Sequence, residues 1–327
     1  MDRMNPETYR PKVSIVMSFY REPLQWIRFA MESILAQTFQ DFELLLICDN
    51  PDYDEAIRYV KEITDRRIRL TINDVNIGPT RSFNMAIAQA QGEYIARMDA
   101  DDICMPERLD RQVAYLDAHP EVSVCATNIH TIDENGKIIR KNRYDRKHDR
   151  ALMFISNNIA HPTVMFRQSL LDIRKPLYNE DYIYSQDYEL WQHLLLKGHV
   201  IHTLEEALLL YRKTEEQISS AKKPLQTELF EKAQKSFISG WLSNHGIIES
   251  EDCEDIHKML EKASFTYRSE PSKELTYIIY ALYLSLGRHD LKYRFKYLWD
   301  RNLIAFRVRF IFTLRLMFAR KRQTRRM

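Results

Sequence analysis

Three carboxylates follow a short apolar run in the first third of this 327-residue chain. The run covers residues 94–98 and reads as a buried strand, and Asp99, Asp101 and Asp102 come directly after it. Side chains two apart in an extended segment point to the same side, so Asp99 and Asp101 can present their carboxylates together. Mg²⁺ is usually held by one or two carboxylates and by the phosphates of a substrate. The spacing therefore predicts a site for a divalent metal and a diphosphate.

A second interpretation of the same residues is structural. Asp is favourable at a helix N-terminus, and Asp102 could cap a helix that opens near Pro106. Because Asp-x-Asp occurs often by chance, the metal hypothesis depends on the elements that surround it.

Predicted strands and helices alternate through the first half of the chain. The apolar runs that read as strands cover residues 13–19, 42–48, 68–72, 94–98, 122–126 and 163–166. Segments with the helical spacing of apolar residues lie at 24–35, 57–63, 83–90 and 109–116, and Gly92 is expected to end the third of them. This alternation predicts an α/β fold with a doubly wound, mixed and mostly parallel sheet flanked by helices.

Sheets of this kind bind ligands outside the carboxyl ends of their strands. Three predicted strand ends carry polar groups, at residues 18–22, 49–50 and 99–102. We therefore expect them to gather in one crevice. Further along, Asn135-Gly136 predicts a β-hairpin, and a helix predicted at 185–196 carries Asp187 near its N-terminus.

Composition excludes several classes of site. With only 7 glycines, the chain contains neither Gly-x-Gly-x-x-Gly nor Gly-x-x-x-x-Gly-Lys, so phosphate must be held in another way, for instance by a metal. The 4 cysteines are widely spaced without Cys-x-x-Cys, which argues against a zinc site or a disulfide framework. The first residues lack an apolar stretch, and the chain has no uncharged apolar run of about 18 residues. We therefore expect no signal peptide and no transmembrane helix.

Taken in order, the motifs resemble those of inverting glycosyltransferases of family 2, which have the GT-A fold, and in particular those of bacterial surface-polysaccharide type. The resemblance spans roughly residues 12–219. It rests on the segments at residues 13–22, 49, 76–84, 92–103, 106–112, 186–191, 211–212 and 219.

The resemblance implies a nucleotide-sugar donor, with UDP the usual nucleotide, and Mn²⁺ or Mg²⁺ as cofactor. By position, the residues implied to bind the nucleotide-sugar are Ser18, Tyr20, Glu22, Asp49, Asn76, Arg81, Asp99, Ala100 and Asp101. Of these, Asp101 and Asp99 would also bind the metal, with Asp101 as the more direct ligand. Asp187 would be the general base.

This chemistry is consistent with the residues. A metal can stabilise the charge that develops on a leaving nucleoside diphosphate, and a single carboxylate can take the proton of the acceptor hydroxyl. One displacement inverts the anomeric centre, whereas a double displacement needs a second carboxylate. The neighbouring Glu180-Asp181 pair is an alternative to Asp187. Gln186 and Thr214 depart from the family pattern, which usually has Glu and His there.

The end of the chain differs from the rest. Residues 1–222 are predicted to form the GT-A catalytic domain, and 223–327 a helical region with a basic, aromatic tail. Residues 288–327 contain 13 basic and 2 acidic side chains, a local charge of +11 in a chain whose net charge is +2. This composition suggests contact with an anionic membrane surface rather than with nucleic acid. The expected location is therefore peripheral, at the inner face of the cytoplasmic membrane, and the expected acceptor is a glycan or a lipid-linked glycan.

Two other functions are consistent with parts of the sequence. A nucleotidyltransferase could use a related sheet, but it would need a Gly-rich loop after the first strand, where residues 18–22 contain no glycine. A non-catalytic protein that binds sugar nucleotides would account for Gln186 and Thr214.

Overall fold

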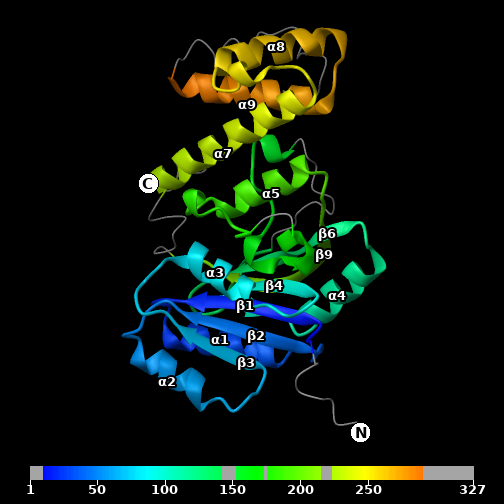
Figure 1. Ribbon diagram of the computed structural model, residues 1–327. Helices are drawn as coiled ribbons and strands as arrows, with labels where there is room; N and C mark the ends of the chain where they lie inside the picture. Colours follow the sequence, from blue (N-terminus) through cyan, green and yellow to red (C-terminus); the bar gives the residue numbers. More distant parts are fainter. Residues whose placement is uncertain (1–9, 142–151, 173–174, 215–222, 290–327) are drawn as a thin grey trace. The chain divides into compact units, whose positions relative to one another are not determined.

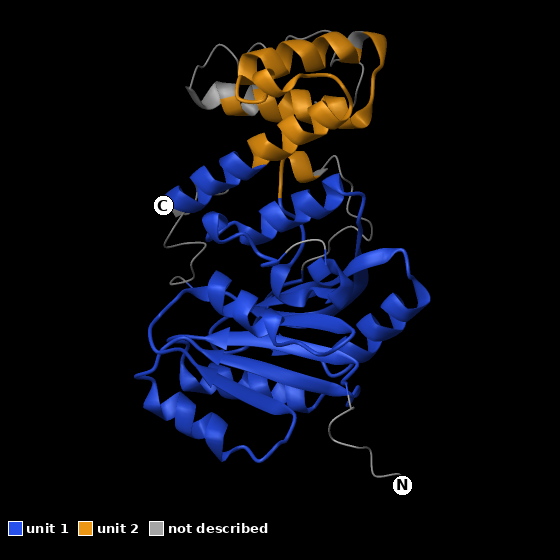
Figure 2. Cartoon of the chain, in the orientation of Figure 1, with its two compact units in different colours: residues 1–149, 157–233 blue, residues 150–156, 234–327 orange. Residues whose placement is uncertain are grey.

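The computed structural model describes residues 10–141, 152–172, 175–214 and 223–289, and the chain divides into two compact units (Figures 1 and 2). Unit 1 comprises residues 1–149 and 157–233, and unit 2 comprises residues 150–156 and 234–327. All of the residues that the sequence proposes for a site lie in unit 1.

Unit 1 is built around a single mixed sheet of nine strands within the described residues. The strand order is β3-β2-β1-β4-β8-β6-β9-β5, and β7 pairs with β6. The strands are β1 (Val13–Phe19), β2 (Phe42–Cys48), β3 (Ile68–Ile72), β4 (Tyr94–Asp99), β5 (Ile103–Cys104), β6 (Val122–Ile132), β7 (Ile138–Lys141), β8 (Met165–Arg167) and β9 (Val200–Arg212).

The register of the central strands places their carboxyl ends side by side. Strand β1 pairs in parallel with β2 on one side and with β4 on the other. Ser18 lies opposite Asp99, and Phe19 lies opposite Cys48. The predicted gathering of these three strand ends at one edge is therefore confirmed. The short strand β8 runs antiparallel to β4 and β6 and joins the two halves of the sheet.

Continuous apolar runs explain the central strands. Every residue of β2 is buried, and so are all residues of β1 except Ser18, because helices and loops cover both faces of the sheet. The flanking helices are α1 (Leu24–Leu35), α2 (Asp54–Glu62), α3 (Pro79–Ala88), α4 (Arg108–Ala118) and α5 (Gln186–Leu196). Helix α3 packs on β1 and β2, directly above the strands whose ends carry the polar groups.

One sequence prediction about a helix end, and one alternative interpretation of Asp102, are wrong. Helix α3 ends at Ala88 with Gln89 as its C-cap, so Gly92 does not terminate it. Gly92 instead lets the chain before β4 approach the backbone of β1 closely, since a Cβ at residue 92 would lie 2.5 Å from the backbone nitrogen of Ser14. Asp102 does not cap α4, whose N-cap is Glu107.

The predicted hairpin is present between β6 and β7. Its turn has Gly136 at φ +84°, a conformation that favours glycine. The Asp133 carboxylate accepts hydrogen bonds from the backbone N–H groups of Asn135 and Lys137, which closes the turn.

Unit 2 is helical. It contains α7 (Lys223–Asn244) from Gln234 onward, α8 (Ile256–Ser269) and α9 (Lys273–His289), and α8 packs against α9. Phe154 stacks on Phe237 with ring centroids 4.5 Å apart. The residues of the basic tail from 290 onward lie outside the described residues, so membrane contact by 288–327 stays a prediction. Among the helices that are described, none combines the length and the apolar character that a membrane span requires.

Candidate active site

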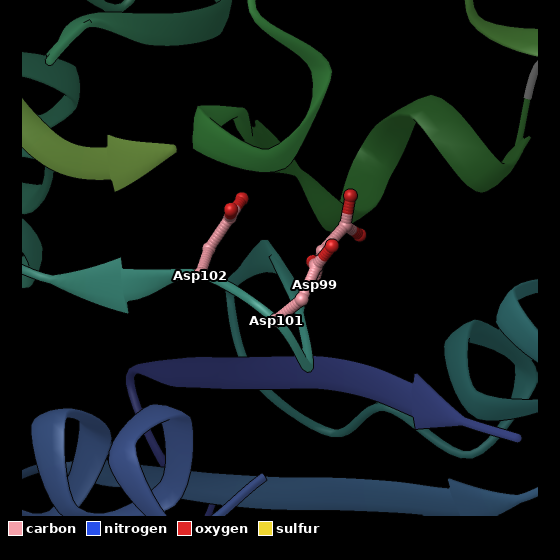
Figure 3. Close-up of side chains that lie close together, drawn as sticks. All are labelled: Asp99, Asp101 and Asp102. Carbon is pink, nitrogen blue, oxygen red and sulfur yellow. The ribbon is translucent and has the colours of Figure 1, made fainter. Parts of the chain in front are cut away.

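The three carboxylates predicted from the sequence converge at the carboxyl end of β4. Asp99 is the last residue of the strand, and Asp101 and Asp102 follow in the turn. One oxygen from each lies within 4.8 Å of the others, and the three side chains rise on the same side of the ribbon (Figure 3). No other group of this kind occurs in the part of the chain that the structure describes.

Asp102 belongs to the predicted carboxylate cluster, but the sequence analysis did not assign it as a metal ligand. Its side chain is fully buried, and its Oδ1 accepts a hydrogen bond of 2.8 Å from the backbone N–H of Arg212. Its Oδ2 is also buried but has no hydrogen-bond partner among the described residues. Burial, reinforced by the charges of Asp101 and Asp99, raises the pKa of Asp102 well above its ordinary value.

A divalent cation suits this arrangement. Leaving a buried carboxylate oxygen without a partner costs about 1–3 kcal/mol or more, and crowded carboxylates repel one another. Hard cations bind oxygen ligands and remove both penalties. The donor set of Asp99, Asp101 and Asp102 therefore fits Mg²⁺ or Mn²⁺.

Arg212, at the end of β9, holds the turn that carries the cluster. Its Nε donates to the backbone carbonyl of Asp101 at 2.8 Å, and its Nη1 donates to the carbonyls of Asp133 and Glu134. Together with the bond from its backbone N–H to Asp102, these contacts tie two turns of unit 1, at residues 101–102 and 133–134, to one buried residue.

The predicted nucleotide-binding residues of β1 lie beside this cluster. Ser18 is half-buried and faces Asp99 in the β1–β4 register. The Glu22 carboxylate accepts hydrogen bonds from the backbone N–H groups of Tyr20 and Arg21, which shapes the loop after β1. Burial raises the pKa of Glu22, and the nearby charge of Asp99 adds to this effect.

Asp49 organises the neighbouring loop. It is 3% exposed, and its two oxygens accept hydrogen bonds from the Asn73 side chain at 2.7 Å and from the backbone N–H groups of Ile77 at 3.0 Å and Gly78 at 2.9 Å. Gly78 takes φ +85°, which favours glycine, and α3 begins directly after it. The same loop carries Asn76, which is exposed.

The remaining donor-site candidates are placed differently. Arg81, in the first turn of α3, is largely exposed and forms an ion pair of 2.9 Å with Glu180. Glu180, one member of the Glu180-Asp181 pair that is the alternative to Asp187, is thus already paired with the Arg81 guanidinium group. Ala100 is buried in the core, so its methyl group is not open to a ligand.

Asp187 lies in the first turn of α5, where the helix dipole favours a negative charge. Its Oδ2 accepts a hydrogen bond of 2.7 Å from the Asn157 side chain. Burial raises the pKa of Asp187, while the backbone N–H of Tyr188, the Asn157 side chain and the charge of Arg97 act in the opposite direction.

The same Arg97 connects this carboxylate to the acidic cluster. It is a buried residue of β4, and its Nη2 forms an ion pair of 2.8 Å with Asp99 Oδ1. Its charge also acts on the pKa of His161 and of Tyr178, whose ring nitrogen Nε2 and hydroxyl oxygen lie 2.8 Å apart. The charge of Arg97 therefore acts both on Asp99 in the cluster and on the pKa of Asp187.

Comparison with known proteins identifies the family. The family model described as glycosyl transferase family 2 matches residues 14–174. An uncharacterized glycosyltransferase of Methanocaldococcus jannaschii, MJ1057, is 35% identical over 211 residues, which cover 63% of this chain and 72% of that protein. The chain belongs to glycosyltransferase family 2.

Other glycosyltransferases are similar over the same extent. The O-antigen biosynthesis glycosyltransferase WbnJ of Escherichia coli is 33% identical over 205 residues, covering 61% of this chain and 79% of WbnJ. The amylovoran biosynthesis glycosyltransferase AmsE of Erwinia amylovora is 29% identical over 204 residues, covering 61% of this chain and 75% of AmsE.

The fold has a counterpart among solved structures. The crystal structure of S. aureus TarS 1–349 in complex with UDP-GlcNAc matches with a TM-score of 0.55 at 16% identity, covering 82% of this chain and 90% of that chain. At this identity the likeness concerns the fold. The predicted GT-A fold, with its mixed, mostly parallel sheet and flanking helices, is confirmed.

Removal of the Asp49 carboxylate tests how the loop before α3 is held. Asp49→Ala leaves two buried or half-buried N–H groups and the Asn73 amide without their acceptor, so we expect a loss of about 1–3 kcal/mol in the free energy of unfolding. Hydrogen exchange at the Ile77 and Gly78 amides should accelerate more than elsewhere. Asp74→Ala, an exposed carboxylate of the same loop, is the control and should change neither quantity. Unchanged exchange in Asp49→Ala would contradict this assignment.

Proposed function

We propose that this family 2 member is a metal-dependent inverting glycosyltransferase that moves a sugar from a UDP-sugar to a hydroxyl group of a glycan or lipid-linked acceptor in bacterial surface-polysaccharide synthesis. The observation that carries the proposal is the cluster of Asp99, Asp101 and Asp102 with its unpartnered buried oxygen.

The acidic cluster is the proposed site of the metal–diphosphate. Asp101 and Asp99 would hold the cation, and Asp102 adds a third oxygen in the same space. When bound there, a divalent cation stabilises the negative charge that develops on the diphosphate as the sugar departs. Ser18, Tyr20, Glu22, Asp49, Asn76 and Arg81 border the nucleotide in this proposal, and Ala100 contributes only its backbone.

Asp187 is the proposed general base. Asn157 donates to its Oδ2, and the carboxylate would accept the proton of the attacking hydroxyl. The ionised form needed for this step is favoured by the helix dipole and by the hydrogen bonds from Asn157 and the Tyr188 backbone. With one base and no second carboxylate assigned as a nucleophile, the reaction is a single displacement that inverts the anomeric centre.

Relatives support the donor and acceptor classes. WbnJ and AmsE are named for O-antigen and amylovoran biosynthesis, and TarS has been crystallised with UDP-GlcNAc and with UDP. A UDP-N-acetylhexosamine or UDP-hexose donor is consistent with these relatives. The charge of residues 288–327 supports a peripheral position at the inner face of the cytoplasmic membrane, where a lipid-linked acceptor would be available.

Binding and turnover can be tested separately. Wild-type protein is heated with UDP, GDP, dTDP or CMP, each with and without Mn²⁺. We expect UDP to raise the unfolding temperature only with Mn²⁺, since a ligand at 100 times its Kd stabilises the native state by about 2.7 kcal/mol. Asp101→Ala should abolish the shift. Asp187→Asn should keep the shift and lose at least about 100-fold in the release of UDP from the donor.

Asp110→Ala, an exposed carboxylate on α4, is the matched control and should behave as wild type. A shift that needs no metal would contradict metal dependence. Nucleotide binding without turnover on any acceptor would instead favour the non-catalytic sugar-nucleotide-binding protein, in which Gln186 and Thr214 mark a lost activity.

The pH dependence of turnover tests the base. Because Asp187 must be ionised to act and burial raises its pKa, kcat should fall as the pH is lowered through a midpoint above the ordinary Asp value of about 3.9. Asn157→Ala removes a hydrogen bond that favours the ionised form, so its midpoint should move to higher pH. Asn179→Ala, whose side chain accepts a bond from the Asp181 backbone instead, should leave the midpoint in place. An identical acid limb in Asn157→Ala and wild type would argue against Asp187 as the base.

A further inference from the structure

Arg97 is a charged residue within an otherwise apolar strand. Its side chain is 7% exposed, and it lies two residues before Asp99, so both side chains extend from the same face of β4. The guanidinium carbon lies 3.6 Å from the centroid of the Phe83 ring on α3. This stacking and the ion pair of 2.8 Å with Asp99 Oδ1 fix the plane and the direction of the guanidinium group.

The hydrogen bonds of Arg97 are incomplete. Its Nε and Nη1 are covered by protein and have no hydrogen-bond partner in the ranges that the structure describes. A buried cation that leaves donors unmatched costs stability, which favours a role for Arg97 other than holding the fold. Because both nitrogens are covered, a ligand cannot bind them directly. Arg97 can still influence a ligand through the Asp99 carboxylate, which its Nη2 binds.

That carboxylate adjoins both Arg97 and the rest of the cluster. Arg97 binds Oδ1 of Asp99. One oxygen of the same carboxylate lies within 4.8 Å of oxygens of Asp101 and Asp102. Groups that bind the far side of a metal ligand fix its orientation, and their loss typically weakens metal affinity 10- to 100-fold. The charge of Arg97 also acts on Asp187, so one buried group adjoins both proposed parts of the site.

We propose that Arg97 is a positioning residue that holds Asp99 by one oxygen, so that the other oxygen is presented to the nucleoside diphosphate and its divalent cation. The proposal rests on the proposed function. A role of the charge alone would have the opposite consequence, since removing a positive charge near a cation site strengthens cation binding. Positioning requires the planar guanidinium group of arginine, stacked on Phe83, and the ammonium group of lysine is not planar.

The test is the affinity for UDP with Mn²⁺, measured by titration calorimetry on the full chain, with thermal unfolding in the absence of ligand as the measure of stability. We expect Arg97→Met and Arg97→Lys each to weaken UDP–Mn²⁺ binding by roughly 10-fold or more and to raise the Mn²⁺ concentration needed for half-maximal binding. Arg167→Lys is the matched control. Arg167 lies on the adjacent strand β8 and, within the described residues, donates only to backbone carbonyls and to the Tyr94 hydroxyl. The Arg167→Lys variant should lose stability without losing affinity.

A double variant tests whether Arg97 works through Asp99. If it does, Arg97→Met should have no further effect on binding once Asp99→Asn is present, so the two losses should not add. Additive losses would overturn the proposal, and so would an Arg97→Lys variant that binds like wild type or an Arg97→Met variant that binds Mn²⁺ more tightly. If the wild-type protein does not bind UDP with Mn²⁺, the proposed function itself fails. The variant comparisons test the role of Arg97 only when the wild-type protein binds, so the two failures are distinguishable.

Discussion

The crowding of negative charge at the end of β4 is the constraint on which the site depends. Three carboxylates place oxygen atoms within 4.8 Å of one another, two of them half-buried and one fully buried. The surrounding structure meets only part of this cost, through the ion pair of Arg97 with Asp99 and the backbone bond from Arg212 to Asp102. What remains is a set of oxygens suited to a divalent cation. In this account, the GT-A sheet positions the cluster, and the bound metal–diphosphate completes its charge balance.

The parts of this arrangement that follow from local pattern were predictable from the sequence. Fully buried parallel strands are continuous apolar runs, so β1, β2 and β4 could be located to within a residue. Once the alternation of strands and helices indicates a parallel sheet, the polar residues after each strand must meet at one edge. This rule places Asp99 and Asp101 beside Ser18 without any structural information.

Other parts depend on contacts between distant segments, which a single sequence does not reveal. Asp102 reads as a helix cap until Arg212, 110 residues later, is seen to donate to it. The sequence predicts Asp49 as a nucleotide contact. In the structure its oxygens accept hydrogen bonds from the loop that ends at Gly78. The one available signal for Arg97 was its charge in the middle of an apolar strand, because a buried arginine is rarely retained without a partner or a function.

The central claim is that the Asp99–Asp102 cluster binds a divalent cation together with the donor's diphosphate. Anomalous diffraction at the manganese edge from crystals of the wild-type protein with UDP and Mn²⁺ tests it most directly. The account predicts an anomalous peak at coordination distance from an oxygen of Asp101 and from both phosphates of UDP. UDP bound with no manganese between it and the cluster, or manganese bound elsewhere, would contradict the account.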